Sequence, residues 1–357
     1  MGRFLLYHPL LWVLALSSCL SDGSLKRPYE GYSPREKGDG WEISSPEKEL
    51  MDHDLLNQAF QLVYSENRFL MAKSLLVARH GKLVAEAYPS NPDDIDKIEN
   101  IQSCTKTITS MVTGIAMQNG LLDSVGQKLS DIYPEHFINV PDKEEITLEH
   151  ALTMRTGLEF NNDTYTLGLY QSTGSSVEFV LSKDVLYQPG QVFHYNDGSP
   201  HLVSAAIGKK AGTSMGAYAG QHLFKPLGIN EWQWEEAKDG VTFGAFSLYL
   251  KPRDMLKIGQ LLLNKGLWNG TRVVDSTWIS EATAIRSTAN FNTASYGYYF
   301  WIFPAEGAFA AEGHGGQIIY VVPQKELVIV YSAWGYTSSM LWDQYTELTD
   351  LIISSCE

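Results

Sequence analysis

Segments that favour β-strands lie near the two ends of the chain, and a long run of helices and loops separates them. Near the start, two β-rich runs within residues 74–88 flank His80-Gly81, a pair typical of a hairpin turn. Near the end, strands are predicted at 296–303, 317–322 and 327–333. A sheet must have a covered face, so we predict that the early hairpin joins the late strands in one antiparallel sheet.

Helices predicted at about 46–66 and 338–354 are the natural cover for this sheet. The expected fold class is therefore α+β: an antiparallel sheet flanked by N- and C-terminal helices, with a large, mostly helical insertion. We expect one domain over residues 46–355, with the sheet part at about 46–100 and 291–355 and the helical part at about 101–290. No period of 20 to 50 residues repeats, which excludes a solenoid.

The first 19 residues have the pattern of an export signal, with Arg3 before an apolar core and two small residues at its end. Leu16-Ser-Ser-Cys19 resembles a bacterial lipobox, which predicts a lipid on Cys19; a plain cleaved signal peptide is the alternative. Residues 20–45 are rich in Gly, Pro, Ser, Lys and Glu and predict a flexible tether. We therefore expect an exported protein, lipid-anchored in the bacterial cell envelope or secreted, that contacts the membrane only through this anchor.

Charge and residue spacing disfavour two functional classes. The net charge of −14, without any basic run, disfavours a nucleic-acid partner. The nine His residues show no H-E-x-x-H or comparable ligand spacing, which disfavours a metallohydrolase. We expect no metal, no cofactor and a small-molecule substrate.

One helix carries a candidate nucleophile. Apolar residues recur with helical periodicity after Ser103-Cys-Thr-Lys106, so Ser103 and Lys106 share one face of the first turn. A serine hydroxyl needs a nearby base, and Lys serves as one only if its pKa falls well below about 10.4. The same spacing at Ser45 and Lys48 predicts only a helix cap before Pro46, and Ser103 could equally be a cap.

Two further segments have residues suited to catalysis. Tyr195 lies in the aromatic segment Phe193-His-Tyr-Asn-Asp-Gly-Ser199, which could equally be a loop that packs on the core. His314 is surrounded by Gly313, Gly315 and Gly316 where a strand begins. Glycines there can mark close approach of a ligand, and their N–H groups could stabilise an oxyanion. A bulged edge strand with a surface His is the alternative.

These three features occur in one order along the chain, and together they resemble the serine beta-lactamase and penicillin-binding-protein superfamily over about residues 50–335. The similarity is strongest to the class-C-like branch, which includes esterases, D-amino-acid peptidases and 6-aminohexanoate-dimer hydrolases. The resemblance implies that Ser103 is acylated and that Lys106 and Tyr195 share proton transfer. It also places His314 where the family carries the Lys of Lys-Thr-Gly, and it implies an oxyanion hole formed by the N–H groups of Ser103 and Gln317. Residues expected to contact substrate are Asn196, Asp197, Gly315 and Gly316.

Two departures from the family pattern bear on the substrate. The usual Tyr-x-Asn is here Tyr195-Asn196-Asp197, and Lys-Thr-Gly is His314-Gly-Gly. The resemblance implies that the first change removes a contact to the antibiotic amide and that the second removes a cation near its carboxylate. We therefore expect an esterase or small amide or peptide hydrolase rather than a beta-lactamase.

Two alternatives stay open at this point. A penicillin-binding or sensor-type protein would be acylated without efficient turnover. An α/β-hydrolase would use Ser214, within Gly212-Thr-Ser-Met-Gly216, as its nucleophile. That motif needs a preceding strand, whereas residues 202–210 are predicted to be helical, so we interpret Ser214 as a helix cap.

Overall fold

The computed structural model describes residues 26–288, 294–334 and 341–357. The predicted export signal and Cys19 lie outside the described residues. Within the described part of the chain, we find no helix with both the length and the apolar character needed to cross a bilayer.

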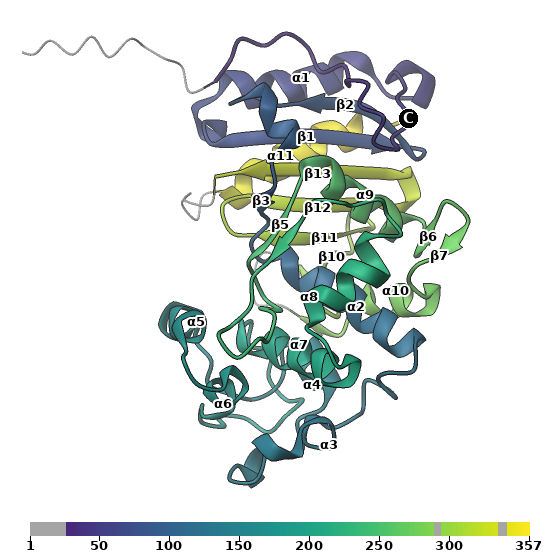
Figure 1. The fold of residues 1–357 in the computed structure, drawn as a ribbon. Coiled ribbons are helices and arrows are strands. Elements are labelled where there is room, and N and C mark those ends of the chain that lie inside the picture. The colour runs from purple at the N-terminus through teal and green to yellow at the C-terminus, as the bar shows by residue number, and fades with distance from the viewer. Residues whose placement is uncertain (1–25, 289–293, 335–340) are drawn as a thin grey trace, which may run out of the picture.

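The predicted sheet is confirmed, and it joins the two ends of the domain (Figure 1). β1 (Ala72–Arg79) pairs antiparallel with β13 (Leu327–Ala333) along its whole length. The eight strands follow the order β2-β1-β13-β12-β11-β10-β9-β8. The remaining strands are β2 (Lys82–Ala87), β8 (Ser287–Thr288), β9 (Ser295–Tyr296), β10 (Trp301–Phe303), β11 (Ala308–Gly313) and β12 (Gln317–Val322). The strand predicted at 296–303 is divided into β9 and β10, and Tyr299 between them has a φ of 64°.

Helices cover both faces of the sheet. One face is covered by α1 (His53–Ser65) and α11 (Leu341–Ser354), as predicted. α1 begins later than expected because Asp52 caps it and Leu50 has a left-handed backbone, with a φ of 57°. The other face is covered by α9 (Pro252–Leu263) and α2 (Cys104–Gln118). α9 packs closely there, because a Cβ at Gly259 would lie 2.4 Å from a Val328 side-chain carbon.

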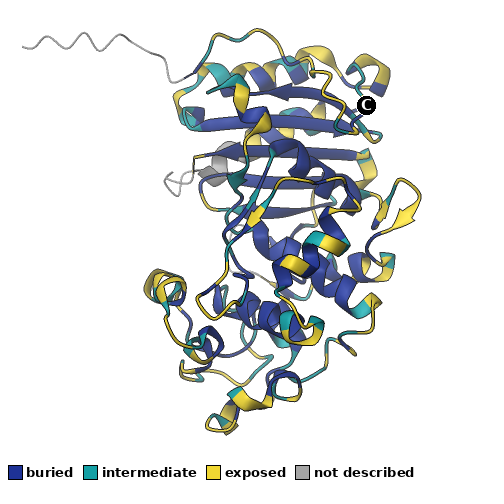
Figure 2. Cartoon of the chain, viewed as in Figure 1, coloured by how far each residue is buried: buried dark blue, intermediate teal, exposed yellow. Residues whose placement is uncertain are grey.

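The helical part lies past the β10 side of the sheet and packs around α2, which is buried over most of its length (Figure 2). Its other α-helices are α3 (Leu129–Ile132), α4 (Leu148–Leu152), α5 (Asn162–Gln171), α6 (Ser176–Leu181), α7 (Gly198–Ala211), α8 (Met215–Ala219) and α10 (Ser276–Ala282). A three-stranded sheet of β3 (Glu99–Asn100), β5 (Leu248–Leu250) and β4 (Gln233–Trp234) connects the two parts, and β6 (Leu267–Trp268) pairs with β7 (Thr271–Arg272). The start of α2 therefore lies where the main sheet, the small sheet and the helical part meet.

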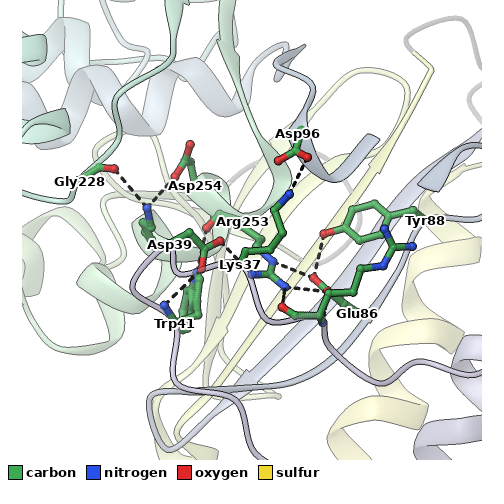
Figure 3. Close-up of polar contacts among 11 residues, drawn as sticks. Lys37, Asp39, Trp41, Glu86, Tyr88, Asp96, Gly228, Arg253 and Asp254 are labelled. Carbon is green, nitrogen blue, oxygen red and sulfur yellow. Dashed lines mark hydrogen bonds and ion pairs between the residues drawn. The ribbon is translucent and has the colours of Figure 1, made fainter. Parts of the chain in front are cut away.

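Residues 26–45 pack against the domain, where the sequence predicts a flexible tether. Tyr32 and Trp41 in this segment are buried, and Ser44 N–H donates to the Leu83 carbonyl of β2. Arg253 of α9 anchors the segment through hydrogen bonds to the Arg35 carbonyl at 2.6 Å and to Asp39 at 2.9 Å (Figure 3). Composition alone predicts a flexible tether, whereas buried aromatic side chains and the ion pairs Asp39–Arg253, Lys37–Asp96 and Glu42–Lys82 hold the segment in place.

Arg253 also neutralises Glu86 of β2. The guanidinium donates to both carboxylate oxygens, at 2.7 and 2.9 Å, and the two side chains are 4% and 1% exposed. We expect Arg253→Leu to lower the free energy of unfolding by roughly 3–5 kcal/mol, because it leaves the Glu86 carboxylate buried without its cation. Chemical denaturation measures this change. Lys128→Ala, which removes an exposed pair with Glu145, should cost less than about 1 kcal/mol; equal losses in the two variants would contradict the buried-pair argument.

Candidate active site

A tight turn presents Ser103 at the start of α2. Gln102, just before it, has a left-handed backbone with a φ of 52°, an uncommon conformation for a residue with a side chain. The turn is held by Gln102 N–H, which donates to the Asn100 side chain, and by Ile101 N–H, which donates to the Leu248 carbonyl of β5. Ser103 is the N-cap residue of α2, yet its side chain makes no capping hydrogen bond. Its hydroxyl is therefore available for another partner.

Lys106 provides that partner. Its ammonium nitrogen lies 2.9 Å from Ser103 Oγ, 2.7 Å from Asp197 Oδ1 and 3.1 Å from the Ala245 carbonyl oxygen. The side chain is only 2% exposed. The structure thus brings Ser103 and Lys106 together, as their spacing predicts.

The charge state of Lys106 differs from what a resting lysine base requires. Burial acts to lower the pKa of Lys106. The Asp197 carboxylate and, to a smaller extent, Tyr195 act to raise it, and together they outweigh burial, so the net pKa lies above its ordinary value. An opposite charge in hydrogen-bond contact favours the charged form. Lys106 is therefore an ammonium at neutral pH, with Asp197 as its counter-ion.

Tyr195 lies beside this pair. Its ring stacks on Trp301 with the centroids 5.6 Å apart, and Lys106 Nζ lies 4.8 Å from its centroid. Burial raises the pKa of Tyr195 and Asp197 adds to this, while the Lys106 charge and hydrogen bonds with Ser103 and Lys106 act to lower it. The net pKa is raised, so the phenol is protonated at neutral pH.

A cavity of about 1040 Å³ opens in front of Ser103. Of the residues predicted from the sequence, Ser103, Tyr195, Asp197 and His314 line it, and His314 is exposed. The other lining residues are Asn100, Gln102, Asn162, Asp163, Thr166, Leu167, Tyr170, Phe246, Ser247, Ala294, Trp301, Phe303, Glu312 and Gly313.

Other predicted residues lie beside the cavity without lining it. The Asn196 side chain donates to the His194 carbonyl and accepts from Ser199 N–H, both at 2.7 Å, which holds the loop that leads into α7. Gln317 begins β12, and its side chain donates to the Ala333 carbonyl. Gly315 and Gly316, with φ of 77° and 101°, shape the turn between β11 and β12.

Three residues that the sequence did not single out belong to this site. Asn162 and Thr166 of α5 both line the cavity and both bond Asp197. Glu312 of β11 also lines it, and burial raises the pKa of this carboxyl to about 8. The spacing of Asn162 and Thr166 places them on one helical face, but no periodic apolar stripe marks α5 as a helix.

Ser214 has a structural role. It is the N-cap of α8, where its hydroxyl accepts from Ala217 N–H at 3.3 Å, and helix α7 precedes it. The strand–turn–helix setting of a G-x-S-x-G nucleophile therefore does not occur at this position.

A Ser–His–Asp cluster, separate from the cavity, lies inside the helical part. Ser176 Oγ lies 2.7 Å from His201 Nε2 and 2.9 Å from an Asp239 oxygen. Ser176 and His201 are both fully buried, and Asp239 bonds the serine at the start of α6 rather than the histidine. These hydrogen bonds connect the start of α6 to His201 of α7 and to Asp239, and the buried Ser176 is not an exposed nucleophile.

Comparison with known structures agrees with this architecture. The putative 6-aminohexanoate-dimer hydrolase from Bacillus anthracis is 20% identical, with 90% of this chain and 87% of that chain covered and a TM-score of 0.72. A family VIII carboxylesterase is 16% identical, with 88% and 99% covered and a TM-score of 0.70. A penicillin-binding protein from Bacillus halodurans is 16% identical, with 85% and 98% covered and a TM-score of 0.64. At these identities the likeness shows the fold.

The family itself is shown by a sequence-family model. The model described as Beta-lactamase matches residues 71–344, which is most of the chain and includes every residue that lines the cavity. Family and fold together support a serine hydrolase in general. The chain belongs to the Beta-lactamase family.

Proposed function

We propose that this protein hydrolyses an ester or a small amide through an acyl-enzyme on Ser103. The observation that carries the proposal is the 2.9 Å contact between Lys106 Nζ and Ser103 Oγ at the wall of a large cavity. A nucleophile and a proton-transfer group in hydrogen-bond contact are the minimum equipment for covalent acyl transfer.

Proton transfer would pass through Lys106, Tyr195 and Asp197 acting together. The pKa values of Lys106 and Tyr195 are both raised, so both groups hold their protons at neutral pH. To accept the Ser103 proton, the Lys106–Tyr195 pair must first lose one proton. The product is either a neutral Lys106 amine beside a Tyr195 phenol or a Tyr195 phenolate beside a Lys106 ammonium. As Ser103 Oγ attacks the carbonyl carbon, the cluster takes the hydroxyl proton and then returns it to the leaving group. Water attacks the acyl-enzyme with the same assistance and releases Ser103.

The oxyanion would form beside the N-terminus of α2, where the Ser103 N–H is one donor. The family resemblance implies Gln317 as the second donor. Gln317 begins the neighbouring strand β12 and does not line the cavity, whereas Glu312, Gly313 and His314 do. We therefore expect the second N–H to come from residues 312–314.

The cavity lining favours an uncharged or apolar acyl group. Among the described residues that line it there is no Lys or Arg, so a substrate carboxylate would find only His314 as a basic side chain, with the Asp163 carboxylate against it. Apolar and aromatic side chains dominate the remaining wall: Leu167, Tyr170, Phe246, Trp301 and Phe303. This lining supports an ester or amide substrate over a beta-lactam, which carries a carboxylate.

A matched pair of esters tests this preference. We expect kcat/KM for p-nitrophenyl pentanoate to exceed that for the p-nitrophenyl monoester of glutarate by about 100-fold, because the terminal carboxylate finds no cation in the cavity. The chromogenic cephalosporin nitrocefin should be turned over at least as poorly as the glutarate ester. Release of p-nitrophenolate and nitrocefin opening are followed by absorbance. Turnover of nitrocefin equal to or above that of p-nitrophenyl pentanoate would contradict the substrate assignment while leaving the Ser103 mechanism standing.

A further inference from the structure

We propose that Thr166 and Asn162 of α5 are positioning residues, which hold the Asp197 carboxylate on Lys106 and so maintain the ion pair beside the nucleophile. This inference rests on the proposed function, because it concerns the reaction at Ser103.

Asp197 is held at three atoms. Its Oδ1 accepts from Lys106 Nζ at 2.7 Å, and its Oδ2 accepts from the Thr166 hydroxyl at 2.6 Å. Its backbone N–H donates to the Asn162 side-chain oxygen at 2.8 Å. Each carboxylate oxygen thus has a donor of its own. A rotation that moves Oδ1 away from Lys106 also breaks the bond to Thr166.

The two α5 residues share one face of their helix. Asn162 and Thr166 are four residues apart, and the same face continues to Tyr170. All three line the cavity, and Tyr170 is 46% exposed beside Leu167, which is 63% exposed. The helix that bonds Asp197 is therefore also a wall of the substrate cavity, so a substrate that moved α5 would act on the ion pair.

Among the charged and titratable neighbours of Lys106, Asp197 has the greatest effect on its pKa. Other titratable groups near the pair come from separate elements, and among the described residues only Asp197 lies within ion-pair distance of the ammonium. These other groups are Cys104 on α2, Tyr195 before α7, Tyr296 on β9 and Glu312 on β11, with Asp163 and His314 farther out along the cavity wall. The position of Asp197 therefore controls how readily Lys106 loses its proton.

The sign of the expected effect follows from this arrangement. Asp197 raises the pKa of Lys106, so the reactive form of the cluster appears only at alkaline pH and log kcat/KM should rise with pH. Asp197→Asn removes the anion and should move this rise to lower pH by about 1–3 units. Thr166→Val keeps the anion but frees its carboxylate to rotate, which should move the rise in the same direction by about 0.5–1 unit, the effect of one hydrogen bond.

The test is a double-mutant cycle on the pH profile of p-nitrophenyl butyrate hydrolysis, corrected for hydrolysis without enzyme. The proteins are wild type, Thr166→Val, Asp197→Asn and the double variant, with thermal unfolding to show that each is folded. Thr164→Val is the matched control, since Thr164 is exposed on the same helix and does not line the cavity. Asn162→Ala should behave like Thr166→Val.

We expect Thr166→Val to shift the profile of the wild type and to add no shift in the Asp197→Asn background, because the two residues act through one carboxylate. Thr164→Val should leave the profile in place. An equal shift by Thr166→Val in both backgrounds, or none in either, would overturn the inference. Failure of the proposed function looks different: the wild type would show no hydrolysis that depends on Ser103 at any pH.

Discussion

Ser103→Ala is expected to lower kcat/KM for p-nitrophenyl butyrate by about 10⁴-fold or more, because nucleophile and proton-transfer groups act as a unit. The substitution removes a single oxygen at a site where the hydroxyl makes no capping bond. The fold should therefore be retained, with a thermal midpoint close to that of the wild type. Steady-state hydrolysis measures the loss, and the rate that remains reports the oxyanion donors and binding alone.

The matched control for Ser103 is Ser214→Ala. Ser214 caps α8, so its loss should cost about 1 kcal/mol of stability and leave hydrolysis within about twofold of the wild type. The reverse pattern, with activity lost in Ser214→Ala and kept in Ser103→Ala, would assign the nucleophile to α8 and reopen the mechanism.

Lys106→Met is expected to lower kcat/KM by about 10³-fold, within the range of a general acid–base group. Methionine fills a similar volume but cannot accept the Ser103 proton or return it to the leaving group. The substitution also leaves Asp197, whose side chain is 10% exposed, without its cation. Thermal unfolding of the same sample separates this loss of stability from the loss of rate.

Lys257→Met is the control for removing a buried lysine. Lys257 lies on α9, pairs with Asp254 at 2.9 Å and is 4% exposed, and it does not line the cavity. The Lys257→Met variant should lose as much stability as Lys106→Met, while its folded fraction keeps most of the wild-type rate of ester hydrolysis. Comparable rates in folded Lys106→Met and folded Lys257→Met would show that Lys106 takes no part in proton transfer.

The sheet could be predicted because its information is local. Runs of β-branched and aromatic residues mark β12 and β13, an apolar run before His80-Gly81 marks β1, and the expected ranges 317–322 and 327–333 match the observed strands. The hairpin near the start and the strands near the end must then join in one antiparallel sheet, because the apolar face of each has to be covered. The contact between Ser103 and Lys106 could be predicted for the same reason, since one helical turn sets it.

The remaining features depend on contacts between distant segments. The packing of residues 26–45 depends on Arg253, more than 200 residues away in the sequence. The charge of Lys106 depends on Asp197, a contact across 91 residues. Asn162 and Thr166 are connected to the site by their hydrogen bonds to Asp197, which lies more than 30 residues away in the sequence. Periodicity and short motifs contain no record of such pairings, so the sequence predicts Ser103 as a candidate nucleophile but not the charge state of Lys106 beside it.

Intact-protein mass spectrometry after treatment with a fluorophosphonate tests the central claim most directly, because it reports the covalent bond that defines the mechanism. It would be run on wild type and Ser103→Ala alongside p-nitrophenyl butyrate hydrolysis. We predict a single adduct and ester turnover in the wild type, with both absent in Ser103→Ala. An adduct without turnover would favour a sensor that is acylated and not released. An adduct of the same size on Ser103→Ala would contradict the assignment of Ser103 as the nucleophile.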